Sequence, residues 1–212
     1  MNVLVIGANG KTGKLVVQGL VKGGQHRVRA MVREPKQIPS LEEMGAETVV
    51  ADLENDIPHA YEGVNAVIFA AGSGSHTGLD KTEQVDHLGA VKSVDEAIKH
   101  GVNRFIMLSS LGADDPAYAP EKLRPFLEAK AQADDHLMQS KLSYTIVRPG
   151  ALSDDPAVGT IAAGRIEDRS GSIPRADVAN TLIACLDEAN TVGKVFEILS
   201  GGTPIDQALQ EL

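Results

Sequence analysis

The stretch Val3-Leu4-Val5-Ile6-Gly7-Ala8-Asn9-Gly10-Lys11-Thr12-Gly13 decides the fold expected of this 212-residue chain. Its four apolar residues are typical of a buried strand, and the apolar positions after it have the spacing of a helix. Glycines spaced G-x-x-G-x-x-G lie between the two, and they would let a pyrophosphate reach the backbone amides that begin the helix. The pattern therefore predicts a dinucleotide site formed by Gly7, Asn9, Gly10, Lys11, Thr12 and Gly13. An ordinary strand-to-helix turn is the alternative.

The composition indicates one α/β domain spanning residues 1–212. Apolar residues make up 42% of the chain and charged residues 23%, which is typical of a globular protein and excludes a disordered one. The net charge of −9 argues against nucleic acid and anionic membranes as partners. The apolar run near the N-terminus is too short for a signal peptide or a membrane span, so we expect a cytoplasmic protein. Monomer and homodimer remain open.

Several other chemistries find no support in the residue patterns. The six histidines and Cys185 show no metal-ligand spacing, so no metal site is expected. The chain has no G-x-S-x-G elbow, which argues against a hydrolase. Asp134 and Asp135 lie in a predicted helix, where a solvated face is their simplest role.

The end of the second predicted strand indicates which cofactor binds. In dinucleotide-binding folds an acidic residue about 20 positions after the glycine motif selects NAD, whereas an arginine accommodates the 2′-phosphate of NADP. This position holds Arg33, with Lys36 nearby and Glu34 one residue beyond the strand. The residues favour NADP(H) over NAD(H), and a solvated charge at a strand end is the alternative.

Two further strands end in candidate cofactor-binding residues, which are Asp52, Leu53, Ala70, Ala71 and Gly72. The carboxylate of the first pair could meet an adenine edge or cap the next turn. The small residues of the second group would let the cofactor lie against the strand. They are equally consistent with tight packing between helix and sheet.

Strands alternate with helical patterns along the chain, which predicts an α/β fold of the Rossmann type. We expect a doubly wound, mostly parallel sheet of about seven strands with helices on both faces. A polar loop at residues 73–78, expected to cross the cofactor's ribose, leads into one long helix. The fifth strand delivers Ser109 and Ser110 to its carboxyl end, where such sheets carry active-site groups. Residues 151–175 and 200–212 are expected to form a small substrate-side cap.

Five motifs spread over nearly the whole chain resemble those of atypical short-chain dehydrogenase/reductases, near the NmrA-like and biliverdin-reductase-B-like proteins. They are residues 7–13, Ala51-Asp52-Leu53, Leu108-Ser109-Ser110, residues 147–152 and residues 175–179. The resemblance implies a seven-stranded sheet with a nicotinamide cofactor along its carboxyl edge. It places Pro149, Gly150, Ala151 and Leu152 beside the nicotinamide and chemistry at Ser109, Ser110 and Lys130. It implies no particular substrate.

The sequence departs from the wider family at the residue expected to donate a proton. Typical members carry Tyr-x-x-x-Lys on a helix, where the lysine holds the ribose and lowers the pKa of the tyrosine. Here Phe126 lies four residues before Lys130, so the lysine is retained without the acid. Tyr118 in the preceding loop could replace the donor, but packing as a loop aromatic is the simpler alternative.

Two functions follow from these patterns. The first is an NADPH-preferring oxidoreductase that transfers a hydride to a small-molecule acceptor. A planar flavin, quinone or tetrapyrrole suits a site without a tyrosine, because its proton can come from solvent. The second is a catalytically weak NADP(H)-binding redox sensor or regulatory protein. The retention of Ser109, Ser110 and Lys130 favours the enzyme.

Overall fold

The strand β1 (Asn2–Ile6) lies inside the sheet and defines its switch point. In the computed structural model, which describes residues 1–74 and 77–212, β1 pairs in parallel with β2 (Arg27–Val32) and with β4 (Ala66–Phe69). The chain winds to one side of β1 through β2 and then returns to the other side at β4. Ligands of doubly wound sheets bind at such a reversal, outside the carboxyl ends of the strands.

The main sheet has nine strands in the order β11-β8-β10-β6-β5-β4-β1-β2-β3. The other strands are β3 (Glu47–Val50), β5 (Arg104–Leu108), β6 (Ser143–Pro149), β7 (Ala151–Ser153), β8 (Thr160–Gly164), β9 (Ser172–Pro174), β10 (Lys194–Ser200) and β11 (Thr203–Pro204). The seven predicted strands, β1 to β6 and β10, all run parallel, so the predicted fold class is confirmed. The predicted count of about seven is too low.

The additional strands come from short segments of the C-terminal third. β8 pairs antiparallel with β10, and β11 pairs antiparallel with β8, which extends the sheet to nine strands. β7 and β9 form a separate parallel pair. Each of the four has five residues or fewer, too few for a clear alternating pattern in the sequence.

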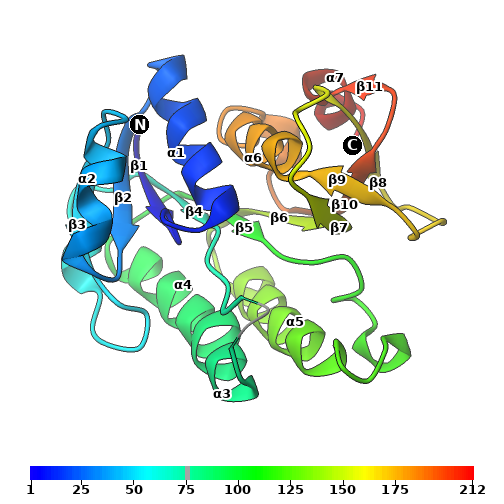
Figure 1. Cartoon of the computed structure of the whole chain (residues 1–212), viewed down its shortest axis with the longest axis horizontal. Coiled ribbons are helices and arrows are strands. Elements are labelled where there is room, and N and C mark those ends of the chain that lie inside the picture. Colours follow the sequence, from blue (N-terminus) through cyan, green and yellow to red (C-terminus); the bar gives the residue numbers. More distant parts are fainter. Residues whose placement is uncertain (75–76) are drawn as a thin grey trace.

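Helices cover both faces of the sheet (Figure 1). The helices are α1 (Lys11–Gly23), α2 (Ile38–Glu42), α3 (Leu79–Lys81), α4 (Gly89–Lys99), α5 (Arg124–Gln139), α6 (Arg175–Ala184) and α7 (Ile205–Gln210), with the 3₁₀ turns η1 (Pro35–Gln37), η2 (Pro58–Tyr61), η4 (Pro116–Tyr118) and η5 (Ala189–Thr191). α1 and α6 pack on one face, and α4 and α5 pack on the other, so each face has its own apolar core. No helix among the described residues is long and apolar enough to cross a bilayer.

The single long helix predicted after the polar loop is divided into three parts. α3 is followed by the π-helical segment η3 (Thr82–Leu88) and then by α4. A π turn contains one more residue than an α turn, and such turns are frequent at functional sites. Asp86 on η3 is fully buried. Ser75 and His76, in the loop predicted to cross the ribose, lie outside the described residues.

Candidate functional site

The glycine turn between β1 and α1 forms an open cradle at the switch point. Gly7 has a φ of +82°, and a Cβ on it would lie 2.6 Å from the backbone of Ala71 at the end of β4. A Cβ on Gly13 would overlap the carbonyl oxygen of Gly7. Gly10 is exposed, and a Cβ there would meet only that same oxygen, at 3.2 Å. Packing therefore explains two of the glycines, whereas Gly10 keeps space open above the turn.

The first turn of α1 is suited to an anion. Gly10 is the N-cap residue, no side chain caps this terminus, and the first turn contains no acidic residue. The exposed amides and the helix dipole there favour a phosphate group. Asn9 is half-buried in the turn, and Thr12 is buried at the start of the helix.

Lys11 is paired with a carboxylate that the sequence did not single out. The ammonium group of Lys11 forms an ion pair with Asp154, whose other oxygen accepts a hydrogen bond from Arg175 at 2.6 Å. The hydrogen bond from Lys11 is the main reason that the pKa of Asp154 lies below its ordinary value. Asp154 follows β7, and Arg175 begins α6, so this contact joins the glycine turn to the C-terminal third of the chain.

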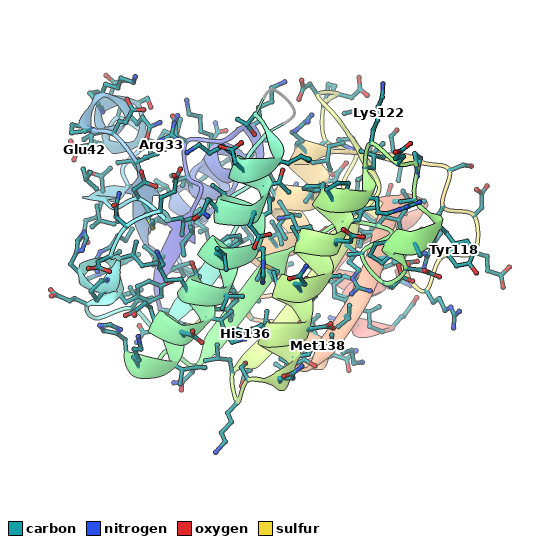
Figure 2. The ribbon with its side chains drawn as sticks, turned by 90° about the horizontal axis from the view of Figure 1, so that it is seen from below. Arg33, Glu42, Tyr118, Lys122, His136 and Met138 are labelled. Atoms are coloured by element: carbon teal, nitrogen blue, oxygen red, sulfur yellow. The ribbon has the colours of Figure 1, made fainter. Side chains whose placement is uncertain are left out.

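Arg33 follows β2, and its side chain is 58% exposed. It lies at the end of the molecule where α5 begins, opposite His136 and Met138 (Figure 2). Its guanidinium is 3.6 Å from Glu34, while the ammonium group of Lys36 is 2.6 Å from the same carboxylate. Hydrogen bonding to Lys36 is the main reason that the pKa of Glu34 is lowered. One carboxylate thus faces two cations, and Arg33 remains accessible.

Asp52 and Leu53 make local contacts. Asp52 Oδ1 accepts a hydrogen bond of 3.1 Å from the amide of Glu54, so the carboxylate caps the turn after β3. Leu53 is buried, and its carbonyl oxygen accepts a hydrogen bond of 2.8 Å from Lys92. The turn-capping alternative accounts for the contact of Asp52, and the adenine contact stays a prediction.

The small residues after β4 pack closely. The backbone of Ala71 lies against Gly7, and a Cβ on Gly72 would come within 3.3 Å of Asp86 Oδ1. The amide of Ala70 donates to the carbonyl oxygen of Ile6 at 2.9 Å, which continues the pairing of β4 with β1. Tight packing therefore explains the small side chains at this edge, which also leaves the cradle unobstructed.

Lys130 on α5 is buried, with 4% of its surface exposed. Its Nζ lies 3.1 Å from Asp86 Oδ1 and donates to the carbonyl oxygens of Ala71 and Leu108 at 3.5 and 3.4 Å. These partners place the ammonium group beneath the carboxyl ends of β4 and β5. The ribose contact predicted for Lys130 stays a prediction, and Asp86 is a partner that the sequence analysis missed.

Ser109 belongs to a second buried polar cluster. Its hydroxyl donates to Asp134 Oδ2 at 2.7 Å, and Arg148 donates to the same oxygen at 3.0 Å from Nε. Asp134 is fully buried, so the solvated face predicted for it is wrong. Burial raises the pKa of Asp134, although Arg148 and Ser109 act in the opposite direction. The local sequence does not distinguish the buried Asp134 from the exposed Asp135 beside it. Only the tertiary partners of Asp134 show that it is buried.

A cavity of about 640 Å³ lies at the carboxyl ends of β5 and β6, within the size range of small-molecule sites. Its lining includes the apolar side chains of Leu111, Leu123, Phe126, Leu127 and Pro149 and the polar side chains of Ser110, Arg169, Ser170 and Ser172. Gly150 and Ala151 complete one wall, and Leu152 lies beyond it in β7. The structure thus brings Ser110 and residues 149–151 to one cavity.

Potential proton donors are scarce around this cavity. Phe126 lies in its wall, and the hydroxyl of Ser110 makes only a long contact of 3.4 Å with the carbonyl oxygen of Leu111. Tyr118 is 88% exposed on η4, outside the lining, at the margin of the molecule in Figure 2. The described residues contain no group of three metal-ligating side chains. A second hollow of about 480 Å³, between α1, α6 and α7, contains none of the predicted site residues.

Comparison with known proteins identifies the family of this chain. The model of a family described as NAD(P)H-binding matches residues 7–189. The chain is 46% identical to the "Uncharacterized sugar epimerase YhfK" of Bacillus subtilis, and the match covers both chains completely. A putative NAD-dependent epimerase/dehydratase from Bacillus halodurans has 47% identity and a TM-score of 0.97 over all of both chains. ChuY, an anaerobillin reductase from Escherichia coli O157:H7, has 25% identity and a TM-score of 0.80 over 94% of this chain and 97% of its own.

Proposed function

The chain belongs to the NAD(P)H-binding family, and we propose that it is an NADPH-preferring oxidoreductase that reduces a planar acceptor in the cavity beside β5 and β6. The observation that carries this proposal is the position of the cavity. It lies on the carboxyl edge of the sheet, the same edge as the open glycine turn and the uncapped N-terminus of α1. A cofactor on this edge would extend from the turn toward the acceptor.

The residues of the turn fit the cofactor. The space kept open by Gly10 would be filled by any Cβ-bearing side chain, and the amides of the first turn of α1 would bind the pyrophosphate. When bound, NAD(P)H supplies a hydride, and the acceptor takes its second hydrogen as a proton from water. Lys130 and Asp86 would hold the ends of β4 and β5 in place beneath the nicotinamide ribose.

A planar acceptor fits the scarcity of acids around the cavity. Ser109 already donates to Asp134, Lys130 is paired with Asp86, and position 126 holds phenylalanine. Reduction of a simple carbonyl gains from an acid that protonates its oxygen, whereas a reduced quinone or flavin can take its proton from water.

We expect the protein to bind NADPH more tightly than NADH. Arg33 and Lys36 share a single carboxylate, that of Glu34, so a positive charge is left over for the 2′-phosphate of NADPH. Replacing Arg33 with alanine should weaken NADPH binding by about tenfold or more and leave NADH binding nearly unchanged, as expected for a charge-assisted contact to the 2′-phosphate. Calorimetric titration of both cofactors measures the effect. Arg27→Ala is the matched control, because Arg27 lies at the opposite end of β2. Equal affinities of the unmodified protein for both cofactors would contradict the preference.

We further expect NADPH to be oxidised by quinones or flavins and only slowly by aldehydes and ketones. Phe126→Tyr should raise turnover of simple ketones by about tenfold or more, below the roughly 10²–10⁴-fold of a full general acid, because Lys130 is committed to Asp86. Phe126→Leu removes the ring without adding an acid and serves as the control. Rapid ketone turnover by the unmodified protein would refute the missing-acid argument. Tight NADPH binding without turnover of any acceptor would favour the redox-sensor function.

A further inference from the structure

The charge of the cavity depends on a single residue of its lining. Arg169, in the segment between β8 and β9, is the only ionisable side chain among the described residues that line it. Lys130 and Arg148 lie nearby but are each paired with a buried aspartate. Within the described lining itself, an electrostatic preference for an acceptor therefore arises from Arg169 and its partners.

Arg169 is bound by two carboxylates from two other segments. Its NH1 and NH2 donate to the two oxygens of Asp114 at 3.1 and 2.6 Å, and NH2 also donates to Glu197 on β10. The amide of Ile166 donates to the second oxygen of Glu197 at 2.7 Å, which holds that carboxylate in place. Much of the hydrogen-bonding capacity of the Arg169 guanidinium is thus used by these two carboxylates and is not available to a ligand in the cavity.

The cluster of Arg169, Asp114 and Glu197 has an excess of negative charge. Burial disfavours ionisation of Asp114, but hydrogen bonding and charge pairing with Arg169 hold its pKa below the ordinary value. Hydrogen bonding to Asp114 is the main reason that the pKa of Arg169 is raised. By formal charge, the one guanidinium of Arg169, which lines the cavity, therefore faces two carboxylates, those of Asp114 and Glu197, which lie next to the lining.

Resting on the proposed function, we infer that the cavity selects planar acceptors without phosphate or carboxylate groups and that the cluster of Asp114, Arg169 and Glu197 disfavours anionic ones. Among the described residues of the lining, an anion would find no unpaired cation, and it would approach the two carboxylates that bind Arg169. The rings of a neutral acceptor would instead contact Leu123, Phe126 and the other apolar residues of the wall.

Riboflavin and FMN provide the test, because they share one redox-active ring system and differ by a phosphate. Their binding is measured by flavin fluorescence polarisation on protein saturated with NADP⁺, which keeps the FMN phosphate out of the pyrophosphate site. Riboflavin should bind about tenfold more tightly than FMN, or better. Equal affinities, or a preference for FMN, would overturn the inference.

Variants of the cluster test its role directly. Asp114→Asn should lower the preference for riboflavin over FMN by about fivefold or more, because Arg169 then has a donor available for the phosphate. Glu197→Gln should shift the preference in the same direction. Asp115→Asn removes the same charge one residue further along the chain. It should leave the ratio of the riboflavin and FMN affinities unchanged. A ratio unaffected by both cluster variants, or changed as much by Asp115→Asn, would contradict the assignment.

Turnover separates this inference from the proposed function. If NADPH reduces both flavins with equal efficiency and they bind equally well, the charge selection is wrong and the oxidoreductase remains supported. If riboflavin binds preferentially but neither flavin nor any quinone is reduced, the selection is supported and the redox function fails.

Discussion

Replacing Gly10 with valine is expected to weaken NADPH binding by about a hundredfold or more, roughly 2.7 kcal/mol. The backbone of Gly10, with φ −69° and ψ 163°, is accessible to any residue, and a Cβ would meet only the carbonyl oxygen of Gly7. The valine side chain would therefore occupy the space above the amides of α1 and would require only a small shift of the Gly7 carbonyl, which lies 3.2 Å from the added Cβ. The fold should lose only about 1 kcal/mol, the scale of a poorer N-cap residue. Calorimetry and urea denaturation measure the two effects.

Two other glycines show whether the effect is specific. Gly202→Val, at a position with open space around it, should leave both NADPH affinity and stability nearly unchanged. Gly13→Ala should destabilise the fold itself, because the added Cβ would overlap the carbonyl oxygen of Gly7. Normal NADPH binding by Gly10→Val would show that the cofactor does not use this turn.

Replacing Lys130 with methionine is expected to lower the free energy of unfolding by about 3–5 kcal/mol, the usual cost of leaving one member of a buried ion pair alone. Asp86 is fully buried, and its Oδ1 has Lys130 as its ionic partner at 3.1 Å. The carbonyl oxygens of Ala71 and Leu108 would lose the same donor. Urea denaturation at constant m-value measures the change.

The paired variant isolates the interaction. Changing Asp86 to leucine in the Lys130→Met background should restore more than half of the lost stability, because the unpaired charge is then removed. Lys141→Met, at an exposed lysine after α5, should change stability by no more than about 0.5 kcal/mol. Additive losses in the double variant would mean that the two side chains do not act as a pair.

Local signals were sufficient for the parallel part of the sheet. The strands β1, β4 and β5 are mostly continuous apolar runs, which burial on both faces produces, whereas β2 alternates apolar with polar residues. The glycine turn was predictable for the same reason, because the strand, the turn and the helix that it joins are adjacent in sequence. Arg33 was singled out by counting from that turn, and its contact with a 2′-phosphate stays a prediction.

Local sequence signals did not reveal which individual polar residues are buried. Asp134 and Asp135 are neighbours on one helix, yet Asp134 is buried against Ser109 and Arg148 while Asp135 is exposed. Asp86 is buried on η3, whose π-helical backbone a helical hydrophobic pattern does not reveal. Short strands such as β11 exist only through the partner that they pair with.

The sequence by itself determined the doubly wound α/β class, the membership in the NAD(P)H-binding family and the glycine turn after β1, because each depends on motifs whose own residues are close together along the chain. Only the tertiary structure decided the composition of the cavity and its charge. Arg169, Asp114 and Glu197 come from three separate segments, and the pairing that neutralises Arg169 arises from distances across the fold. An ion pair between residues distant in sequence leaves no periodic signal, so the structure was needed to show that the arginine in the cavity wall is already bound.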